Sequence, residues 1–478
     1  MNQIPYIINT FRGGISDENS KGIPGSFKFG KNLDIHKRDD SLTCKQKPMI
    51  TWDSPDLVKW FVPATDGSLY AFCANGSIYA RTGGTGDWNG VYNDENGDIR
   101  GAVEWKTDDG DNYMYWATST SIARKAFPGN GSLPWTDAIQ DWKTLLDPYP
   151  WHTMKISSGD MMVANGPYLA SYTYEEVYDS GIMSIRPGNS IKALEERDDY
   201  VIMGSYRNDN AEEGHLWNWI SGVVQKYIQK KKVPTQGINA LITTEVPLCQ
   251  AGFDGQLYYS DFESMIPLIQ IPGGGQCYPG ATDIEDGLAL FGMFGGTNAG
   301  IWSYGRKAKN RSLVPNYEYT MTGTLGGTTS TIGAIAVQNG KTFVSWGAPT
   351  EAGGSRYCVE EVSSTLKANA VYEGLEFNAG RPYWKKQVDT VKFTMSPMPT
   401  GTSVSCKFKF DKESDWRYAI LGDNTTTFSV PNAVEVEFNI GKQGVIYEIG
   451  AELNPYGNET PEILSITSYL SPQGYEHQ

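Results

Sequence analysis

The chain has 478 residues and a formal net charge of −15, and only 20% of its residues are charged. This acidic balance argues against a protein that grips nucleic acid, because phosphate binding needs clustered Lys and Arg. The many Gly (53), Tyr (28) and Trp (14) residues favour an all-β protein over a helical repeat, since aromatics fill pleated surfaces and Gly makes turns.

Residues 1–55 contain short apolar runs separated by turn residues. Residues 6–8 and the alternating stretch 27–35 are typical of strands, and Gly22, Pro24 and Gly25 mark a turn before the second stretch. We expect residues 1–55 to form an N-terminal arm with the first strands, packed on the following domain.

Residues 66–88 contain the clearest structural unit of the chain. Residues 69–73 and 77–81 are both strand-like, and Asn75-Gly76 lies between them. Asn-Gly between alternating runs is the strongest short-range hairpin signal, because both central turn residues need positive φ. We expect a hairpin here.

Looser copies of this hairpin recur along the chain. The apolar runs that we expect as inner strands are residues 69–72, 113–116, 161–164, 200–203, 256–259, 288–291 and 342–345. Six steps from residue 70 to residue 343 give a mean spacing of about 45 residues, close to the length of one four-stranded propeller blade. A two-sheet sandwich imitates two or three such units but hardly seven. We therefore predict a six- to eight-bladed β-propeller over residues 56–380.

One segment breaks the repeat. Residues 214–232 have apolar and aromatic positions near helical spacing, and three Lys residues close the segment. These positions are Trp217, Ile220, Val224, Tyr227 and Ile228. We predict a helical insertion here, with its Lys-rich end favourable at the helix C-terminus. The insertion could serve in docking or in contacting phosphate. Alternatively, it simply packs on the propeller edge.

The composition shifts after Gly380-Arg381-Pro382. Residues 403–410 place Val404, Cys406, Phe408 and Phe410 on one face, which is the period of a half-buried strand. Further strand-like runs follow to residue 470, separated by turn signals. We predict a C-terminal β-sandwich over residues 381–478.

Several groups along the chain are candidates for catalysis or metal binding. The carboxylate pairs Glu195-Glu196 and Glu360-Glu361 read as ordinary solvated pairs, and the glycine clusters 273–275 and 295–296 lack the context of a phosphate loop. The acidic stretches 94–98 and 108–111 could hold Ca²⁺, but plain β-turns fit them better. The second stretch also lacks the spacing of a sialidase-type turn. The histidines without a partner motif are His36, His152, His215 and His477.

These patterns predict no catalytic residue, no metal site and no cofactor. The six cysteines form no CxxC pair, so we expect reduced thiols and folding in a cytoplasm. They are Cys44, Cys73, Cys249, Cys277, Cys358 and Cys406. No signal peptide is visible, and no apolar run approaches the ~20 residues of a membrane span, so we expect a soluble protein.

The start of the chain resembles tailed-bacteriophage virion propellers. The resemblance lies in residues 7–16 (IINTFRGGIS), 25–27 (GSF) and 31–35 (KNLDI). In those proteins a Phe-x-Gly-Gly start and an Asn-Leu-Asp type strand precede degenerate blades. The motif covers about 30 residues, and only the β-rich layout extends further.

The resemblance implies a non-enzymatic structural protein of the phage tail, neck or tail tip. Its partners would be other virion proteins and further copies of itself in a symmetric ring, with passive contact to the genomic DNA. It would be made in the host cytoplasm and reside in the virion, with its C-terminal module docking to the tail or the host. No catalytic residue can be carried over.

The alternative is a propeller that binds or cleaves glycans at the host surface. Four aromatic side chains could stack on sugars, namely Trp135, Trp142, Trp151 and Trp217. A third option, an interaction hub in the cytoplasm, lacks the WD-type signature. Copy number and glycan cleavage separate these hypotheses.

Overall fold

The computed structural model describes residues 4–475, apart from residues 19, 37–40, 85, 108–109, 111, 127–134, 147–148, 208–212, 221–226, 228, 235, 323–329 and 350–354. The described residues form 38 β-strands and one short 3-10 turn at Thr82–Gly84, and they contain no α-helix. The predicted all-β class is therefore confirmed.

The chain folds into two compact units. Unit 1 combines Met1–Pro48, Ile301–Thr320 and Val362–Gln478, and unit 2 combines Met49–Gly300 with Met321–Glu361. The boundaries predicted near residues 55 and 380 stay a prediction. What the structure adds is that the first 48 residues belong to the same unit as the C-terminal segment.

Four-stranded sheets follow one another along the chain. The first has the order β4-β5-β6-β7 and is antiparallel throughout. Five more have the same up-and-down order, and a further sheet joins β28, β29 and β30 to β3, which precedes the first sheet in the chain. Such closure by a strand from the other end of the repeat ties the first and last sheets together.

The strands of these sheets are β3 (Gln46–Ser54), β4 (Val58–Pro63), β5 (Leu69–Cys73), β6 (Ser77–Arg81), β7 (Asn89–Asn93), β8 (Gly101–Lys106), β9 (Asn112–Ala117), β10 (Ser121–Ala126), β11 (Ile139–Thr144), β12 (Met154–Ser157), β13 (Asp160–Asn165), β14 (Tyr168–Tyr172), β15 (Tyr178–Ser184), β16 (Asn189–Arg197), β17 (Tyr200–Arg207), β18 (Gly214–Ile220), β19 (Gln229–Lys232), β20 (Ile238–Thr243), β21 (Pro247–Ala251), β22 (Gln256–Ser260), β23 (Met265–Gln270), β24 (Gln276–Glu285), β25 (Leu288–Phe294), β26 (Gly300–Gly305), β27 (Val314–Tyr319), β28 (Thr331–Gln338), β29 (Lys341–Pro349) and β30 (Ser355–Lys367).

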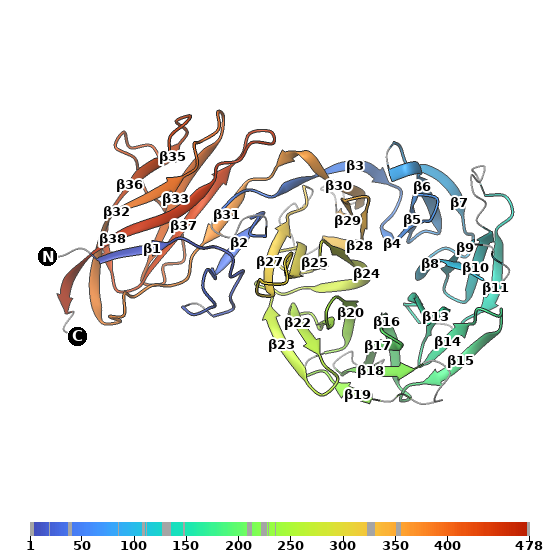
Figure 1. The fold of residues 1–478 in the computed structure, drawn as a ribbon. Coiled ribbons are helices and arrows are strands. Elements are labelled where there is room, and N and C mark those ends of the chain that lie inside the picture. Colours follow the sequence, from blue (N-terminus) through green and yellow to red (C-terminus); the bar gives the residue numbers. More distant parts are fainter. Residues whose placement is uncertain are drawn as a thin grey trace. The chain divides into compact units, whose positions relative to one another are not determined.

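The first strands of successive sheets make a closed ring within unit 2. The ring runs β4, β8, β12, β16, β20, β24 and β28, each strand contacting the next, and β28 contacts β4 again. Figure 1 shows these strands around a common centre, with the following strands of the unit lying further out. A closed ring of innermost strands backed by up-and-down sheets is the architecture of a β-propeller. Unit 2 is a β-propeller.

Aromatic and aliphatic side chains fill the space between neighbouring sheets. Phe72 and Ile78 of the first sheet pack with Met114 and Trp116 of the second, and all four are fully buried. Burial of such side chains is worth about 1.5–3 kcal/mol each for the aliphatic residues. The high aromatic content therefore serves the packing between sheets, as the composition predicts.

The predicted hairpin at residues 69–81 is confirmed, but its turn differs. Strands β5 and β6 pair with Tyr70 opposite Ala80, which leaves a three-residue loop at residues 74–76. Only Gly76 of the Asn75-Gly76 pair has a positive φ, at 90°, and its N–H donates to the Cys73 carbonyl at 3.1 Å. A type I turn followed by a left-handed Gly fits a three-residue hairpin loop. A Cβ at Gly76 would also lie 2.5 Å from the Asp94 carbonyl oxygen.

The seven predicted apolar runs are all strands, but they are not the innermost ones. Six are the second strand of their sheet, whereas residues 256–259 fall on β22, the third strand. If the second strand of that sheet, β21, is used instead, at residue 249, the spacing is 47 residues from residue 202 and 41 residues to residue 290. Second strands are the most continuous apolar runs because other strands cover both edges and both faces. Every residue of β5, for example, is buried.

The helix predicted at residues 214–232 is wrong. Strand β18 pairs with β17 from Tyr206 opposite Gly214 to Tyr200 opposite Ile220, and β19 pairs in turn with β18. Trp217 and Trp219 follow the two-residue period of a strand and are both buried in the core. The spacing of Trp217 and Ile220 imitates a helical period. The predicted apolar positions at 224 and 228 lie outside the described residues.

Unit 1 contains two further sheets. One has the order β1-β38-β32-β36, and the other has the order β2-β31-β37-β33-β34, with β35 also paired to β33. The Tyr447 hydroxyl of the second sheet lies 3.2 Å from the Ser468 hydroxyl of the first, inside a buried apolar layer. The strands are β1 (Ile4–Ile8), β2 (Phe29–Lys31), β31 (Ala370–Glu373), β32 (Trp384–Met395), β33 (Ser403–Phe410), β34 (Arg417–Tyr418), β35 (Thr427–Phe428), β36 (Glu435–Gly444), β37 (Tyr447–Asn454) and β38 (Ile463–Tyr475).

The Phe-x-Gly-Gly start of the chain makes a tight loop in unit 1. Phe11 is buried and meets the Tyr372 ring edge-on, with ring centroids 5.4 Å apart. The Gly13 N–H donates to the Gly25 carbonyl at 3.0 Å, and a Cβ at Gly13 would lie 2.2 Å from the Ser26 nitrogen. The glycine is therefore required by a close backbone approach.

Candidate functional site

The second carboxylate pair singled out in the sequence is bonded within the propeller. Glu360 is fully buried and accepts the Trp346 indole N–H at 2.8 Å, so the expectation of a solvated pair is wrong for this residue. Glu361 pairs with Arg81 at 2.8 Å and with Lys341 at 2.6 Å. Burial opposes the charge of Glu361, but these two cations hold the pKa of its carboxyl below the usual range.

The acidic stretch 94–98 is built as a turn. The Asp94 carboxylate accepts the Asn96 N–H at 2.9 Å and the Trp116 indole N–H at 2.6 Å. Of the stretch 108–111, only Gly110 lies within the described residues. Among the described residues no group of three or more His, Cys, Asp or Glu side chains is arranged to hold a metal ion.

Three of the four histidines are buried. His152 places Nδ1 2.8 Å from the Ala164 carbonyl and Nε2 3.3 Å from the Ser119 carbonyl, so its ring bridges two backbone segments. His215 lies on β18 near Glu213 and next to the ring of Trp217. Burial, assisted by Lys230, lowers the pKa of His215 to about 4. His477 lies outside the described residues.

All six cysteines are buried and unpaired with one another. Burial raises the pKa of the Cys44 thiol to about 11 and that of the Cys249 thiol to about 12. Thiols of this kind behave as small apolar side chains rather than as nucleophiles, because the reactive form is the thiolate.

The four tryptophans proposed for sugar stacking differ in their surroundings. Trp217 and Trp135 are buried in the core, so they cannot present a ring face to a ligand. Trp142 is half-buried against Tyr115, Tyr172 and the guanidinium of Arg124. Trp151 is half-buried and lines a pocket.

The ring of strands encloses a central cavity of about 440 Å³. Three acidic side chains, Glu104, Glu195 and Asp283, line it together with Lys155, which pairs with Glu195 at 2.9 Å. Asp283 accepts the Val337 N–H at 2.6 Å, and burial raises the pKa of its carboxyl. Glu104 accepts the Thr65 N–H at 2.7 Å. Each of the three carboxylates therefore has a partner within the protein.

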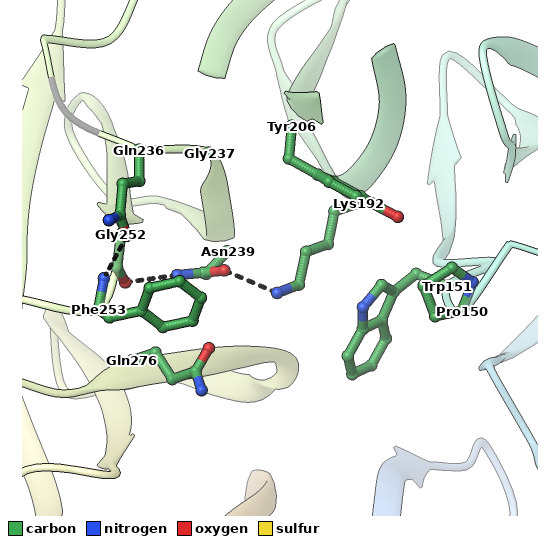
Figure 2. A pocket seen from close by; sticks show the side chains of 10 residues that line it. All are labelled: Pro150, Trp151, Lys192, Tyr206, Gln236, Gly237, Asn239, Gly252, Phe253 and Gln276. Carbon is green, nitrogen blue, oxygen red and sulfur yellow. Dashed lines mark hydrogen bonds between the residues drawn. The ribbon is translucent and has the colours of Figure 1, made fainter. Parts of the chain in front are cut away.

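A second, smaller cavity of about 150 Å³ lies at the end of the ring where the innermost strands begin. Figure 2 shows its centre, where the Lys192 ammonium donates to the Asn239 side-chain oxygen at 2.7 Å. The same ammonium lies 5.2 Å from the centre of the Trp151 ring. Burial lowers the pKa of Lys192 to about 8. The remaining lining residues are Pro150, Tyr206, Gln236, Gly237, Gly252, Phe253 and Gln276.

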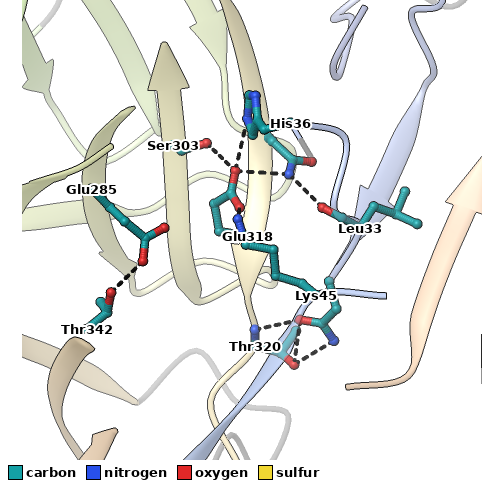
Figure 3. Close-up of polar contacts among 10 residues, drawn as sticks. Leu33, His36, Lys45, Glu285, Ser303, Glu318, Thr320 and Thr342 are labelled. Atoms are coloured by element: carbon teal, nitrogen blue, oxygen red, sulfur yellow. Dashed lines mark hydrogen bonds and ion pairs between the residues drawn. The ribbon is translucent and has the colours of Figure 1, made fainter. Parts of the chain in front are cut away.

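Unit 1 contains the other buried charge cluster of note, centred on Glu318. Figure 3 shows this carboxylate beside His36 and Lys45. It accepts a hydrogen bond from the Ser303 hydroxyl at 2.6 Å. Asn316 donates a further hydrogen bond at 3.0 Å. Burial alone would raise the pKa of Glu318, but Lys45 and His36 outweigh it and hold the pKa well below its usual range.

Sequence reasoning missed both buried charges. Lys192 interrupts the apolar run Ile191 to Leu194, and Glu318 stands between two tyrosines. A lone charged residue inside an apolar strand is the signal that would have found them, because such residues are rarely buried unless they are paired.

Comparison with known proteins identifies a fold likeness but no family. No family model matches the chain, and no curated protein matches it. The chain is similar to the crystal structure of the WD40 β-propeller domain of Doa1, with 10% identity and a TM-score of 0.45 over 67% of this chain and 98% of that chain. It is also similar to the Cps50 (Swd1) β-propeller domain of Myceliophteria thermophila, with 11% identity and a TM-score of 0.43 over 66% of this chain and 98% of that chain.

Both TM-scores lie below 0.5, so the propeller assignment rests on the closed ring of strands and not on these likenesses. Within the described part of the chain, no helix has the length and apolar character needed to cross a membrane.

Proposed function

We propose that this chain is a non-enzymatic structural component of a tailed-phage virion, a tail, neck or tail-tip ring protein that acts through protein–protein contacts. It combines a seven-bladed propeller with a C-terminal β-sandwich. Its partners are other virion proteins and further copies of the same chain.

The observation that carries this proposal is that the chemically capable side chains serve the fold. Glu360 holds an indole, Glu361 joins Arg81 to Lys341, and His152 bridges two carbonyls. A catalytic acid or base must be free to reach a substrate proton, at about 2.6–3.2 Å. These groups instead hold neighbouring strands and sheets together, as in a scaffold.

One ion pair joins the first and last sheets of unit 2, because Arg81 on β6 pairs with Glu361 on β30 at 2.8 Å. A second pair, Arg356 on β30 with Asp53 on β3 at 2.8 Å, lies within the last sheet. Strand β3 belongs to this last sheet and precedes β4 of the first sheet in the chain, so it ties the ring shut. A closed ring keeps its connecting loops in fixed positions, and loops on a rigid scaffold are where binding surfaces are usually built.

The test is to measure copy number and position in purified particles. We expect quantitative mass spectrometry to find the chain in virions at a multiple that matches the tail symmetry, and cryo-electron microscopy to show it as a symmetric ring. A label on the C-terminus would show whether unit 1 faces the tail or the host. A protein that is monomeric, absent from particles and able to cleave a glycan would overturn the proposal.

A further inference from the structure

We propose that the pocket around Lys192 binds one anionic sugar unit, a six-membered ring that carries a carboxylate. In this arrangement the carboxylate meets the Lys192 ammonium and the sugar ring lies against Trp151. This inference goes beyond the proposed structural role and does not depend on it.

Lys192 carries an unmatched charge. The residue is only 8% exposed, and its ammonium is bonded to one neutral oxygen, that of Asn239. Among the described residues no carboxylate lies within ion-pair distance of this ammonium. A buried charge without a counter-ion is costly, and an ammonium has three N–H donors, so two remain for a ligand.

Asn239 is held in place so that its side-chain oxygen accepts only one of those N–H donors. Its side-chain amide donates to Gln250 at 3.0 Å and to the Gly252 carbonyl at 2.7 Å, which turns its oxygen toward Lys192. The lysine head is therefore positioned before any ligand arrives. Positioning of this kind lowers the entropy that binding must lose.

The walls of the pocket combine aromatic rings with side-chain amides. Trp151 and Phe253 present aromatic rings, with Phe253 51% exposed at the pocket, and Gln236 and Gln276 add side-chain amides. Figure 2 shows Trp151 and Phe253 on different sides of the lysine. Apolar walls with a few placed polar groups are typical of small-molecule sites. They favour a ligand with a ring over a bare inorganic anion.

The volume limits the ligand to a single ring. The cavity holds about 150 Å³. An engineered protein cavity of about the same size accommodates benzene, which is one six-membered ring. A longer glycan would therefore place one terminal unit in the pocket and leave the rest in solvent.

The experiment is calorimetric titration of the full chain with D-glucuronate, D-glucose and inorganic phosphate at pH 7. We expect glucuronate to bind with a Kd of roughly 1 mM, and glucose and phosphate to bind at least tenfold more weakly. Lys192→Met should abolish the preference for glucuronate over glucose. Trp151→Ala should weaken glucuronate binding about tenfold, because it removes the aromatic face against which the sugar ring lies.

Lys59→Met is the matched control. Lys59 also lies over the Trp151 ring, at 5.8 Å, but it is paired with Asp98. Its loss should change the glucuronate Kd less than twofold. Thermal melting of each variant shows whether it is folded, so a loss of binding in a folded Lys192→Met protein is specific.

The pH dependence gives a second readout. Burial lowers the pKa of Lys192 to about 8 against the opposing effect of the nearby Cys277 thiol, whose own pKa burial raises to about 12. The ammonium is therefore present at pH 7 and largely lost at pH 9. We expect glucuronate affinity to fall several-fold over this range. Equal affinity for glucuronate and glucose, equal affinity for phosphate, or full binding by Lys192→Met would each overturn the proposal.

Discussion

Two buried charges in this molecule differ in how many partners surround them. Glu318 in unit 1 is surrounded by partners, since Lys45, His36, Ser303 and Asn316 all approach its carboxylate. Lys192 in unit 2 has one neutral hydrogen-bond partner and an aromatic wall. The pKa shifts agree with this difference, because that of Glu318 favours the charged form and that of Lys192 disfavours it.

Charges that hold the fold together thus differ from charges that are available to a ligand. Removing one partner from a fully bonded buried charge is strongly destabilising, whereas a buried charge with few partners already carries an uncompensated desolvation cost in the native state. We therefore assign Glu318 to the structure of unit 1 and Lys192 to recognition.

The largest expected effect follows from removing the Glu318 carboxylate from its cluster of partners. Glu318→Gln removes the buried carboxylate that Lys45 and His36 face, and we expect the free energy of unfolding to fall by about 3–5 kcal/mol. Chemical denaturation at pH 7 measures this. The double variant Glu318→Leu with Lys45→Met removes both charges and should recover most of the loss. A Glu318→Gln protein within about 1 kcal/mol of wild type would contradict the structural role of the cluster.

The propeller could be predicted from the sequence far better than these two charges. The apolar second strands, such as residues 69–73 and 342–345, repeat at a spacing that only a few architectures allow. Lys192 and Glu318 show in the sequence only as single charges among apolar or aromatic residues, and their partners cannot be predicted because these come from distant parts of the chain. Asn239 follows Lys192 by 47 positions and Lys45 precedes Glu318 by 273. The helix predicted at 214–232 fails for a related reason, since pairing to β17 decides the conformation of β18.

The next effect has the opposite sign. Lys192→Met removes a costly buried charge, so we expect the free energy of unfolding at pH 7 to rise by about 1–3 kcal/mol. Below pH 8 the lysine is protonated in both states, and the folded state bears the full cost. Between pH 8 and 10.5 the folded amine is neutral while the unfolded one is charged, so wild-type stability rises with pH and the gap to Lys192→Met narrows. Denaturation at pH 7 and pH 9.5 measures both, and a destabilised Lys192→Met protein would argue against an unmatched charge.

His215 gives a third case, in which burial is tolerated because the ring stays neutral. Its pKa is lowered to about 4, first by burial and then by Lys230, so between pH 6.5 and 4 the unfolded state binds a proton that the folded state does not. Stability is therefore lost as pH falls through this window. We expect wild type to lose about 1 kcal/mol more than His215→Gln between pH 6.5 and 4.5, measured by denaturation. Equal losses would mean that the ring is readily protonated in the folded protein.

The smallest effect concerns Lys59, a cation beside the same Trp151 ring as Lys192. Lys59 pairs with Asp98, and their side chains are 18% and 42% exposed, so solvent screens both charges. Ion pairs of this kind contribute about 0–1 kcal/mol, and we expect Lys59→Met to stay within that range of wild type in chemical denaturation at pH 7. If Lys59→Met gained as much stability as Lys192→Met, the two ammonium groups would be equivalent and the contrast would reflect the aromatic ring. If only Lys192→Met gained stability, the cost in the wild type would come from the missing counter-ion of the Lys192 ammonium.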